Sequence, residues 1–562
     1  MRTVLGGGLI GAALFVAVLG TAIVRPSNLG WTMRNDLQIY MLAFTHFRHE
    51  PWHWPPGRID GVGYPVGTSI GNTDAVPLAS FALKPWHPLL PTPFQFLGAW
   101  LLLCFVLQGV FGVLLLRLAT PDWRLQLLGA ALFVQMPALF NRLGHPALCA
   151  HWLLLASIWL LVDGMREARR WHLAAWLVLA GVVAATQPYL AAMVWLLAAG
   201  ALANRVCDVR PRSLAAARLT GGIAAVTATM GAIFWLCGFF LIGAGANLQA
   251  EGLGLFSMNL LGPFTGMGFT TLLPELPTAL PGQYEGLVYF GAGWLLLLAV
   301  ALATEARNAA HRPGLGAGWL SVAACTVIAL SPRITLGPWT LVDLMAWAPP
   351  ALSAFRSTGR FGWVTMYAVL AVVAMAVVRR LPRRPAIALM TAAVVLQAVD
   401  LSTAYRGLHA RERSPEWTDY DSPVKSAAWT VVVPAYRHLV MVPPDMCAAV
   451  WSPVAGPHLP FSLLAGTSGV TINTGNAGRY DTDAVLRYCA TLEADVRAGR
   501  VSDDSVYVLS PAMRAALAAA TPVPLSCGVL DGVDVCVTAA SATRWQDTAS
   551  RAEFAPSIVT PP

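Results

Sequence analysis

The sequence predicts a polytopic α-helical membrane protein that ends in a mixed α/β domain outside the membrane. Of its 562 residues, 56% are hydrophobic and 12% are charged, and a soluble domain usually carries about twice that charged share. Long apolar runs recur from the N-terminus to about residue 402. From about residue 404 polar and charged residues return and the apolar runs shorten.

We expect about eleven membrane helices, because an apolar run of ~20 residues is needed to span a bilayer. The uncharged run after Met1-Arg2-Thr3 is too long for the core of a signal peptide and predicts a retained first helix. Several segments are short, and Pro137 and Pro188 predict broken or re-entrant pieces. The predicted segments are 4–24, 94–116, 125–140, 147–163, 173–187, 189–204, 219–242, 286–304, 315–331, 362–378 and 386–402.

Arginine supplies most of the formal net charge of +8, since Lys84 and Lys425 are the only lysines. The arginines cluster in every second loop, which is typical of orientation signals and not of a nucleic-acid face. These loops and the N-terminus are therefore predicted to be cytoplasmic, and the C-terminus external. The clusters are Arg117/Arg124, Arg166/Arg169/Arg170, Arg205/Arg210/Arg212/Arg218, Arg307/Arg312 and Arg379/Arg380/Arg383/Arg384.

Two domains are predicted: a membrane domain at 1–403, with a long first external loop at 25–93, and an external α/β domain at 404–562. We expect an irregular tail at 539–562. Alternating apolar residues predict strands, and a 3.6-residue period predicts helices. The predicted strands are His438–Val442, Ser468–Ile472, Ser505–Leu509 and Val533–Val537, and the predicted helices are Asp481–Gly499 and Pro511–Ala520.

The nine cysteines show no CxxC or Cys/His spacing, so they predict no metal site. Cys447, Cys489, Cys527 and Cys536 lie in the polar C-terminal region, and their even number fits disulfides in an oxidising compartment. The stretch from Cys527 to Cys536 predicts a hairpin turning at Asp531-Gly532, which would allow a bridge between these two cysteines.

The first external loop carries two acids with catalytic potential. Asp36 follows the first helix by about a dozen residues, where a carboxylate can act as a general base. Its alternative role is a helix cap or a solvated charge. Asp74 is a second candidate, with an N-cap before Pro77 as the alternative. Between them, Trp52 and Tyr64 lie in proline- and aromatic-rich stretches that fit either stacking on a sugar or polyprenyl chain, or membrane anchoring.

Arg356 and Arg360 stand four residues apart before the tenth predicted helix and would share one face of a helical segment. Such a pair can bind a phosphate, and snorkelling to lipid headgroups is the alternative.

Further candidates lie at predicted external helix ends. Glu285 is an acid at a membrane boundary, where a functional role and an ion pair with an arginine are both typical. His145 and His151 lie on a short external loop, with hydrogen bonding inside the bundle as the alternative. Gln187 and Tyr189 flank the proline break at Pro188.

An aspartate shortly after the first membrane helix is a hallmark of the GT-C glycosyltransferase superfamily, and the chain resembles a largely uncharacterised bacterial family assigned to it. The resemblance covers most of 25–400 and is weaker in the C-terminal domain. It rests on Asn35-Asp36, Pro51-Trp52, Tyr64-Pro65-Val66-Gly67-Thr68-Ser69, Thr73-Asp74-Ala75-Val76-Pro77-Leu78, Phe94-Gln95-Phe96, Gly144-His145, His151-Trp152, Glu285-Gly286 and Arg356–Phe361.

The resemblance implies inverting transfer of a sugar from a polyprenyl-phosphate donor to a periplasmic glycan, lipid or protein, in the bacterial inner membrane. Asp36 would be the base, and Arg356 and Arg360 would hold the donor phosphate. The first loop lacks the tight acidic pair that some GT-C members carry. We therefore expect no obligatory metal, with a divalent cation as the alternative. The rival functions are a flippase for lipid-linked glycans, which would be expected to show repeated halves, and a non-catalytic envelope assembly protein.

Overall fold

The computed structural model describes residues 1–167, 169–207, 209–242, 252–307, 316–447, 458–475, 477, 479, 481–520, 522–545 and 557–559. It divides into two compact units. Unit 1 comprises Met1–Arg25, Phe96–Ile233 and Leu248–Pro415, and unit 2 comprises Pro26–Gln95, Phe234–Asn247 and Glu416–Pro562. The segment predicted to be the first external loop therefore folds with the C-terminal domain and not with the helices that flank it in the chain.

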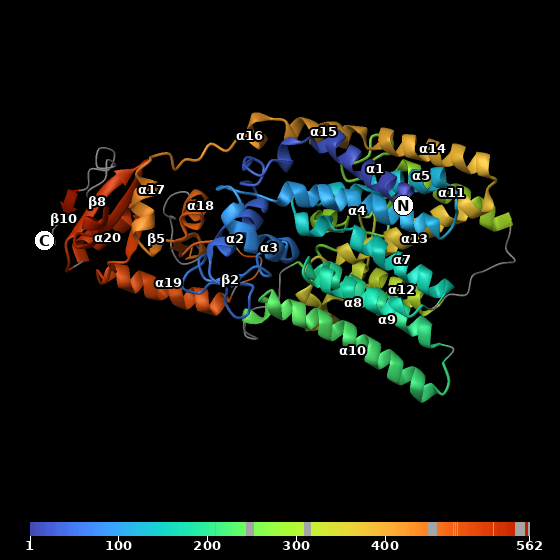
Figure 1. Cartoon of the computed structure of the whole chain (residues 1–562), viewed down its shortest axis with the longest axis horizontal. Coiled ribbons are helices and arrows are strands. Elements are labelled where there is room, and N and C mark those ends of the chain that lie inside the picture. The colour runs from blue at the N-terminus through green and yellow to red at the C-terminus, as the bar shows by residue number, and fades with distance from the viewer. Residues whose placement is uncertain are drawn as a thin grey trace. The chain divides into compact units, whose positions relative to one another are not determined.

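Unit 1 is a bundle of long helices (Figure 1). Its helices are α1 (Arg2–Leu19), α4 (Leu97–Arg117), α5 (Trp123–Val134), α6 (Pro137–Phe140), α7 (Trp152–Arg166), α8 (Trp171–Ala184), α9 (Pro188–Val206), α10 (Arg212–Leu236), α11 (Ala292–Arg307), α12 (Ala317–Leu330), α13 (Gly362–Arg380), α14 (Arg383–Asp400) and α15 (Ser402–Glu412). Glycines let some of them pack backbone to backbone. A Cβ on Gly11 of α1 would lie 2.1 Å from the carbonyl oxygen of Phe105 in α4, and membrane helices commonly use small residues in this way.

Each of the eleven predicted segments contains a helix, but eleven spans are not confirmed. Within the described part of the chain, six segments are long and apolar enough to cross a membrane: Arg2–Leu19, Leu97–Arg117, Pro146–Arg166, Pro188–Val206, Arg212–Leu236 and Thr358–Arg380. The pair α14 and α15, bent by 54°, would add a seventh. Helices α5, α8, α11 and α12 are apolar but fall short of the length that a straight span needs.

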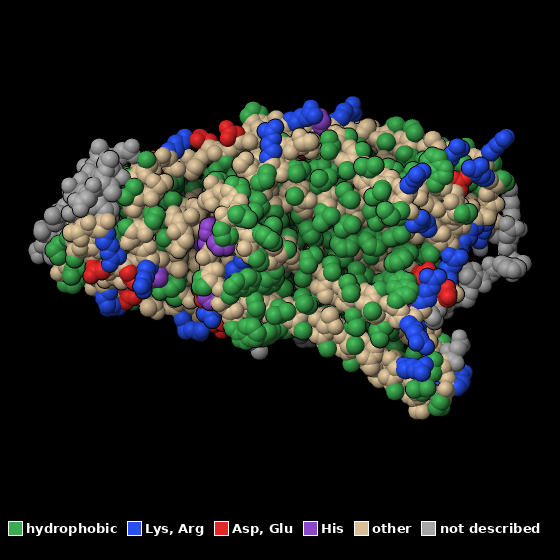
Figure 2. All heavy atoms as spheres, in the orientation of Figure 1, with side chains coloured by type: hydrophobic (Ala, Val, Ile, Leu, Met, Phe, Trp, Pro, Cys, Tyr) green, Lys and Arg blue, Asp and Glu red, His purple; other side chains and the backbone are tan. Residues whose placement is uncertain are grey.

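The surface of unit 1 fits a multi-pass membrane protein. Hydrophobic side chains cover most of the visible face of the bundle, and many basic side chains, which in this unit are all arginines, gather at one end of it (Figure 2). An apolar face of this size suits lipid better than water. The direction in which the chain crosses the membrane stays a prediction.

Unit 2 is built on a sheet with the strand order β10-β8-β9-β7-β5-β6. Strands β6 and β7 run parallel to β5, whereas β9, β8 and β10 continue the sheet antiparallel. Its strands are β5 (His438–Val442), β6 (Thr471–Ile472), β7 (Ser505–Leu509), β8 (Leu525–Leu530), β9 (Val533–Thr538) and β10 (Ser557–Val559). Helices α18 (His458–Ser468), α19 (Thr482–Arg497) and α20 (Pro511–Ala520) accompany the sheet.

These elements confirm the predicted strands at 438–442, 505–509 and 533–537 and both predicted helices. The strand predicted at 468–472 is only Thr471–Ile472, because α18 extends to Ser468. The tail expected to be irregular contributes η12 (Ser541–Trp545) and the edge strand β10. Disulfides join Cys447 to Cys489 and Cys527 to Cys536, the latter across the β8–β9 hairpin.

The predicted first external loop extends the free edge of this sheet. Ile472 of β6 donates its backbone N–H to the Gly61 carbonyl at 2.7 Å, and Tyr64 donates to the Ile472 carbonyl at 2.9 Å. The loop also contains α2 (Leu37–His49), the short hairpin β1 (Arg58–Ile59) and β2 (Thr68–Ser69), and α3 (Pro77–Leu83). His46 of α2 is buried, and its Nε2 lies 3.0 Å from the Ser462 carbonyl of α18.

Candidate functional site

Unit 1 holds a buried cluster of two arginines and one glutamate, which we call the ion cluster (Arg142, Glu285 and Arg360). Glu285 lies in the 3₁₀ turn Pro281–Gly286, and Arg360 lies in the 3₁₀ turn Thr358–Phe361. Glu285 Oε2 accepts from Arg142 Nη1 at 2.6 Å and from Arg360 Nη2 at 2.6 Å and Nε at 3.1 Å. The side chains are only 3–7% exposed, so the charges interact in a medium that screens them weakly.

Two glycines allow this cluster to form. Gly286 follows Glu285 and Gly359 precedes Arg360, and the two backbones touch. A Cβ on Gly286 would lie 2.8 Å from Gly359 Cα, and a Cβ on Gly359 would lie 2.9 Å from both Gly286 Cα and the Phe256 carbonyl oxygen. Any side chain at either position would push the segment that carries Glu285 away from the segment that carries Arg360.

The ion cluster carries a net charge of about +1, because one carboxylate faces two guanidinium groups. Burial alone would raise the pKa of Glu285, but Arg360 and Arg142 outweigh burial and hold that pKa below its usual value. Three atoms of the ion cluster and the adjoining turn, Arg142 Nε, Ser357 Oγ and Thr358 Oγ1, are buried and make no hydrogen bond with a described residue. Excess positive charge together with unsatisfied donors is costly in a buried site and favours binding of an anion.

Tyr189 joins the ion cluster to the start of α9. Its ring centroid lies 4.7 Å from Arg360 Cζ, and its hydroxyl accepts from the Ser357 backbone N–H at 3.1 Å. Gln187 is the N-terminal cap of α9, because its Oε1 accepts a hydrogen bond from the Tyr189 backbone N–H at 2.6 Å. Helices α9 and α13 both begin at this site, and the positive ends of their dipoles add to its preference for negative charge.

The two histidines divide between the ion cluster and the helix bundle. His145 is half-buried and lies close enough to Glu285 to interact with it electrostatically. His151 is fully buried, and its Nδ1 lies 2.9 Å from the Tyr367 hydroxyl, which in turn accepts from Gln108 Nε2 at 3.0 Å. These contacts favour the alternative of hydrogen bonding inside the bundle for His151.

The segment with Arg356 and Arg360 is not one helix. The turn Pro350–Ala354 ends before Arg356, and a new turn begins at Thr358. The spacing of four residues therefore does not place the two arginines on one helix face. Arg360 is buried against Glu285, whereas Arg356 is exposed and packs its guanidinium 5.6 Å from the Phe256 ring centroid.

Other predicted external arginines have local partners. Arg48 donates to the Pro91 carbonyl at 3.0 Å, and Arg58 donates to Asp60 at 2.7 Å. In the part of the chain that the structure describes, Arg356 forms no ion pair. It is therefore the better placed of the predicted phosphate ligands to reach a soluble or membrane-borne anion.

The candidate acids Asp36 and Asp74 lie in unit 2. Asp36 is exposed and immediately precedes α2, but its side chain does not cap that helix. Asp74 is half-buried, and the residue that caps α3 is Val76. Asn35, Asp74 and Val76 have φ angles of 45°, 54° and 48°, a region that non-glycine residues rarely occupy and that often marks functional sites.

The predicted aromatic contacts of the first loop also lie in unit 2. Trp52 is 56% exposed, stacks on Phe81 with ring centroids 6.3 Å apart, and has Lys84 Nζ 4.5 Å from its ring centroid. Tyr64 stacks on His438 of β5 at 4.3 Å. Trp52 therefore has a surface available to a ligand, whereas Tyr64 secures the loop to the α/β domain.

Sequence reasoning placed Arg142, Ser357 and Thr358 within motifs of interest but gave none of them a role of its own. For Arg142 the same signal was available as for Arg356, because an arginine on the predicted external side needs an anionic partner or ligand. Among the described residues, no group of three or more His, Cys, Asp or Glu side chains could hold a metal ion.

Comparisons with known proteins place the chain in a family. Residues 8–402 match the model described as a domain of unknown function, DUF6311, and residues 428–538 match the DUF6311 C-terminal domain. No curated protein matches the sequence. Among solved structures, the chain is similar to the apo crystal structure of the Archaeoglobus fulgidus oligosaccharyltransferase, with 10% identity, a TM-score of 0.41, and coverage of 94% of this chain and 73% of that one. Since the first model alone spans well over half of the sequence, the chain belongs to the DUF6311 family.

Proposed function

We propose that this protein is a membrane glycosyltransferase that moves a sugar, with inversion, from a polyprenyl-phosphate donor to a periplasmic glycan, lipid or protein. The observation that carries the proposal is the ion cluster, a buried site of net positive charge with unsatisfied donors. The exposed Arg356 stands four residues before Arg360 in the sequence. In our proposal the anion that this charge attracts is the phosphate of the lipid donor, which contacts the exposed Arg356.

The proposed roles of the arginines follow from the position at which negative charge develops during sugar transfer. When the bond between the sugar and the phosphate breaks, negative charge grows on the departing phosphate oxygen. Preorganised cations stabilise this charge better in the transition state than in the ground state. In our proposal Arg356 contacts the phosphate, and Arg360 and Arg142 supply a fixed positive field. No metal is required in this scheme.

Asp36 is the proposed general base, taking the proton of the acceptor hydroxyl as its oxygen attacks the sugar carbon. Its exposure leaves it accessible to an acceptor, and the left-handed backbone of Asn35 beside it supports a special role. Asp74, with its own left-handed backbone, is the second proposed catalytic acid.

The test is consumption of radiolabelled polyprenyl-phosphate sugars by the full-length protein in lipid nanodiscs and in proteoliposomes. We expect donor hydrolysis or transfer, and a loss of about a hundredfold or more for Asp36→Asn, since a general base contributes 10²–10⁴. Asp421→Asn is the matched control, because the Asp421 side chain is 83% exposed and pairs with Lys425 at the surface.

Full activity of Asp36→Asn would remove Asp36 as the base. Movement of intact donor across the proteoliposome bilayer, without its consumption, would replace the transferase with a flippase. Absence of both turnover and movement would leave the protein as a non-catalytic assembly factor.

A further inference from the structure

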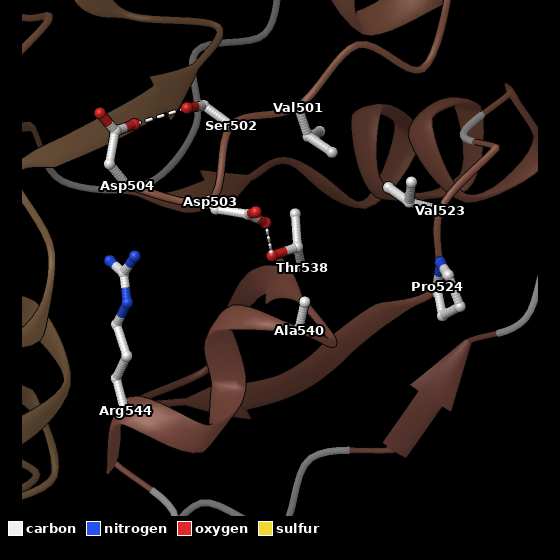
Figure 3. A pocket seen from close by; sticks show the side chains of 9 residues that line it. All are labelled: Val501, Ser502, Asp503, Asp504, Val523, Pro524, Thr538, Ala540 and Arg544. Carbon is white, nitrogen blue, oxygen red and sulfur yellow. Dashed lines mark hydrogen bonds between the residues drawn. The ribbon is translucent and has the colours of Figure 1, made fainter.

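The α/β domain of unit 2 contains a pocket of about 610 Å³ at the edge of its sheet where β7 and β8 begin and β9 ends. Asp503 and Asp504 line it just before β7, Thr538 lines it at the end of β9, and Arg544 lines it from η12. Arg544 extends toward the side of the pocket that holds the two aspartates (Figure 3). The volume falls within the ~300–1,000 Å³ typical of small-molecule sites.

The charged groups of this pocket are held in place without neutralising one another. Asp503 accepts from the Thr538 hydroxyl, and Asp504 accepts from the Ser502 hydroxyl at 2.5 Å. The Arg544 guanidinium lies 5.4 Å from the Tyr436 ring centroid and forms no ion pair with any described residue. Each carboxylate therefore keeps acceptor capacity, and Arg544 keeps its N–H donors for a ligand.

The pocket lining carries two carboxylates and one guanidinium group, a net charge of about −1, so it disfavours an anionic ligand. A cationic ligand would pair with the carboxylates but leave the Arg544 donors without a partner. A neutral polyol satisfies both kinds of group, because its hydroxyl groups donate to carboxylates and accept from a guanidinium group. Val523 and Pro524 add an apolar wall to the pocket, against which the C–H face of a sugar ring can pack.

We propose that this pocket binds a neutral saccharide segment of the acceptor glycan. Its identity as the acceptor rests on the transferase function proposed above, whereas the affinity for a saccharide does not. The proposed function allows a glycan, a lipid or a protein as the acceptor. A saccharide-binding pocket restricts the acceptor to a glycan, or to a molecule that carries a glycan.

The pocket is connected to the first external loop by side-chain contacts. His438 Nε2 lies 3.7 Å from Asp504 Oδ2, and the His438 ring stacks on Tyr64. The loop that carries the proposed base is thus joined to the pocket within one folded unit. Such a connection suits a domain that presents an acceptor to the loop.

The experiment applies the full-length protein in nanodiscs to an array of neutral and anionic oligosaccharides. We expect binding to neutral glycans, with affinity lowered at least tenfold by Arg544→Ala and by Asp503→Asn. Arg487→Ala, which removes an exposed arginine from α19, serves as the matched control and should bind as the wild type does. Equal melting temperatures for all variants would show that the losses are local.

Absence of binding to every neutral glycan, preference for anionic glycans, or unchanged affinity in both pocket variants would overturn the proposal. The Asp36→Asn variant distinguishes the transferase function from saccharide binding, because we expect it to lose donor turnover but to bind the glycan as the wild type does. Glycan binding without any donor turnover would reject the transferase function but support the saccharide-binding pocket. Donor turnover without glycan binding would support the transferase function but reject the saccharide-binding pocket.

Discussion

Charge is used in opposite ways in the ion cluster of unit 1 and in the pocket of unit 2. In the ion cluster, Arg142, Glu285 and Arg360 are almost fully buried, and both arginines donate to Glu285. In the pocket, Arg544 is exposed and stays apart from the carboxylates that line the same cavity. The ion cluster holds two backbone segments together and retains a net positive charge. The pocket, in contrast, keeps hydrogen-bonding groups available to a ligand.

The difference teaches where a mutation should affect folding and where it should affect binding. Breaking one partner of a buried ion pair leaves an uncompensated charge in a poorly screened environment. Removing an exposed charge costs little stability, because water already solvates it. The two regions can therefore be told apart by whether stability or ligand affinity responds to substitution.

The largest expected effect is that of Glu285→Gln. The substitution keeps the size of the side chain but leaves Arg142 and Arg360 buried without a counter-charge, so we expect a loss of about 3–5 kcal/mol in unfolding free energy. Thermal unfolding of the nanodisc-embedded protein measures it. Glu167→Gln is the control, because Glu167 pairs with Arg169 at the surface. A loss no larger than that of the control would mean that the cluster is not a structural unit.

The pH dependence of the same cluster follows from the lowered pKa of Glu285. The stabilisation is complete above the ordinary glutamate pKa of about 4.5 and is lost as the pH falls through the lower pKa of the folded state. The difference in stability between the wild type and Glu285→Gln should therefore shrink on acidification below pH 4.5.

A smaller effect is expected for Gly286→Ala. The new Cβ would press on the Gly359 backbone, and overpacking of this kind costs about 1–3 kcal/mol. We also expect reduced donor turnover, since the displaced segment carries Glu285. Gly407→Ala tests the specificity of the effect, because a Cβ there meets nothing within 4 Å. Equal stability of both variants would show that the two segments can separate without cost.

Local sequence patterns predicted much of the fold. Apolar runs located the helices, and the Asp531-Gly532 turn located the β8–β9 hairpin, where both residues have positive φ angles. The number of spans was not predictable in this way, because short helices such as α5 and α8 carry the same apolar signal as full spans. Helix α2 was not predicted, since a mixed run such as Leu37–His49 depends on α18 for its packing.

The candidate sites depend on contacts between distant parts of the chain. Glu285 and Arg360 were named from their positions beside helices, but Arg142 lies 143 residues from Glu285 in sequence. The pairing of Arg142 with Glu285 depends on packing that no local pattern encodes. The spacing of Arg356 and Arg360 predicted a shared face only for a continuous helix, and the break between the two 3₁₀ turns removes that condition.

The smallest expected effect on stability is that of Arg356→Ala, which tests whether an exposed cation beside the ion cluster acts on a ligand. Arg356 touches only the Phe256 ring among the contacts described, so we expect a change of about 0.5 kcal/mol or less in unfolding free energy. Losing a charge-assisted hydrogen bond to the donor phosphate should raise KM about tenfold to a hundredfold, which corresponds to about 1.5–3 kcal/mol. Arg58→Ala, at an exposed arginine paired with Asp60, should leave both quantities unchanged. If Arg356→Ala lowers stability as much as Glu285→Gln does, Arg356 stabilises the fold and is not a ligand-binding residue. If Arg356→Ala leaves KM unchanged, the donor phosphate must be bound by other residues.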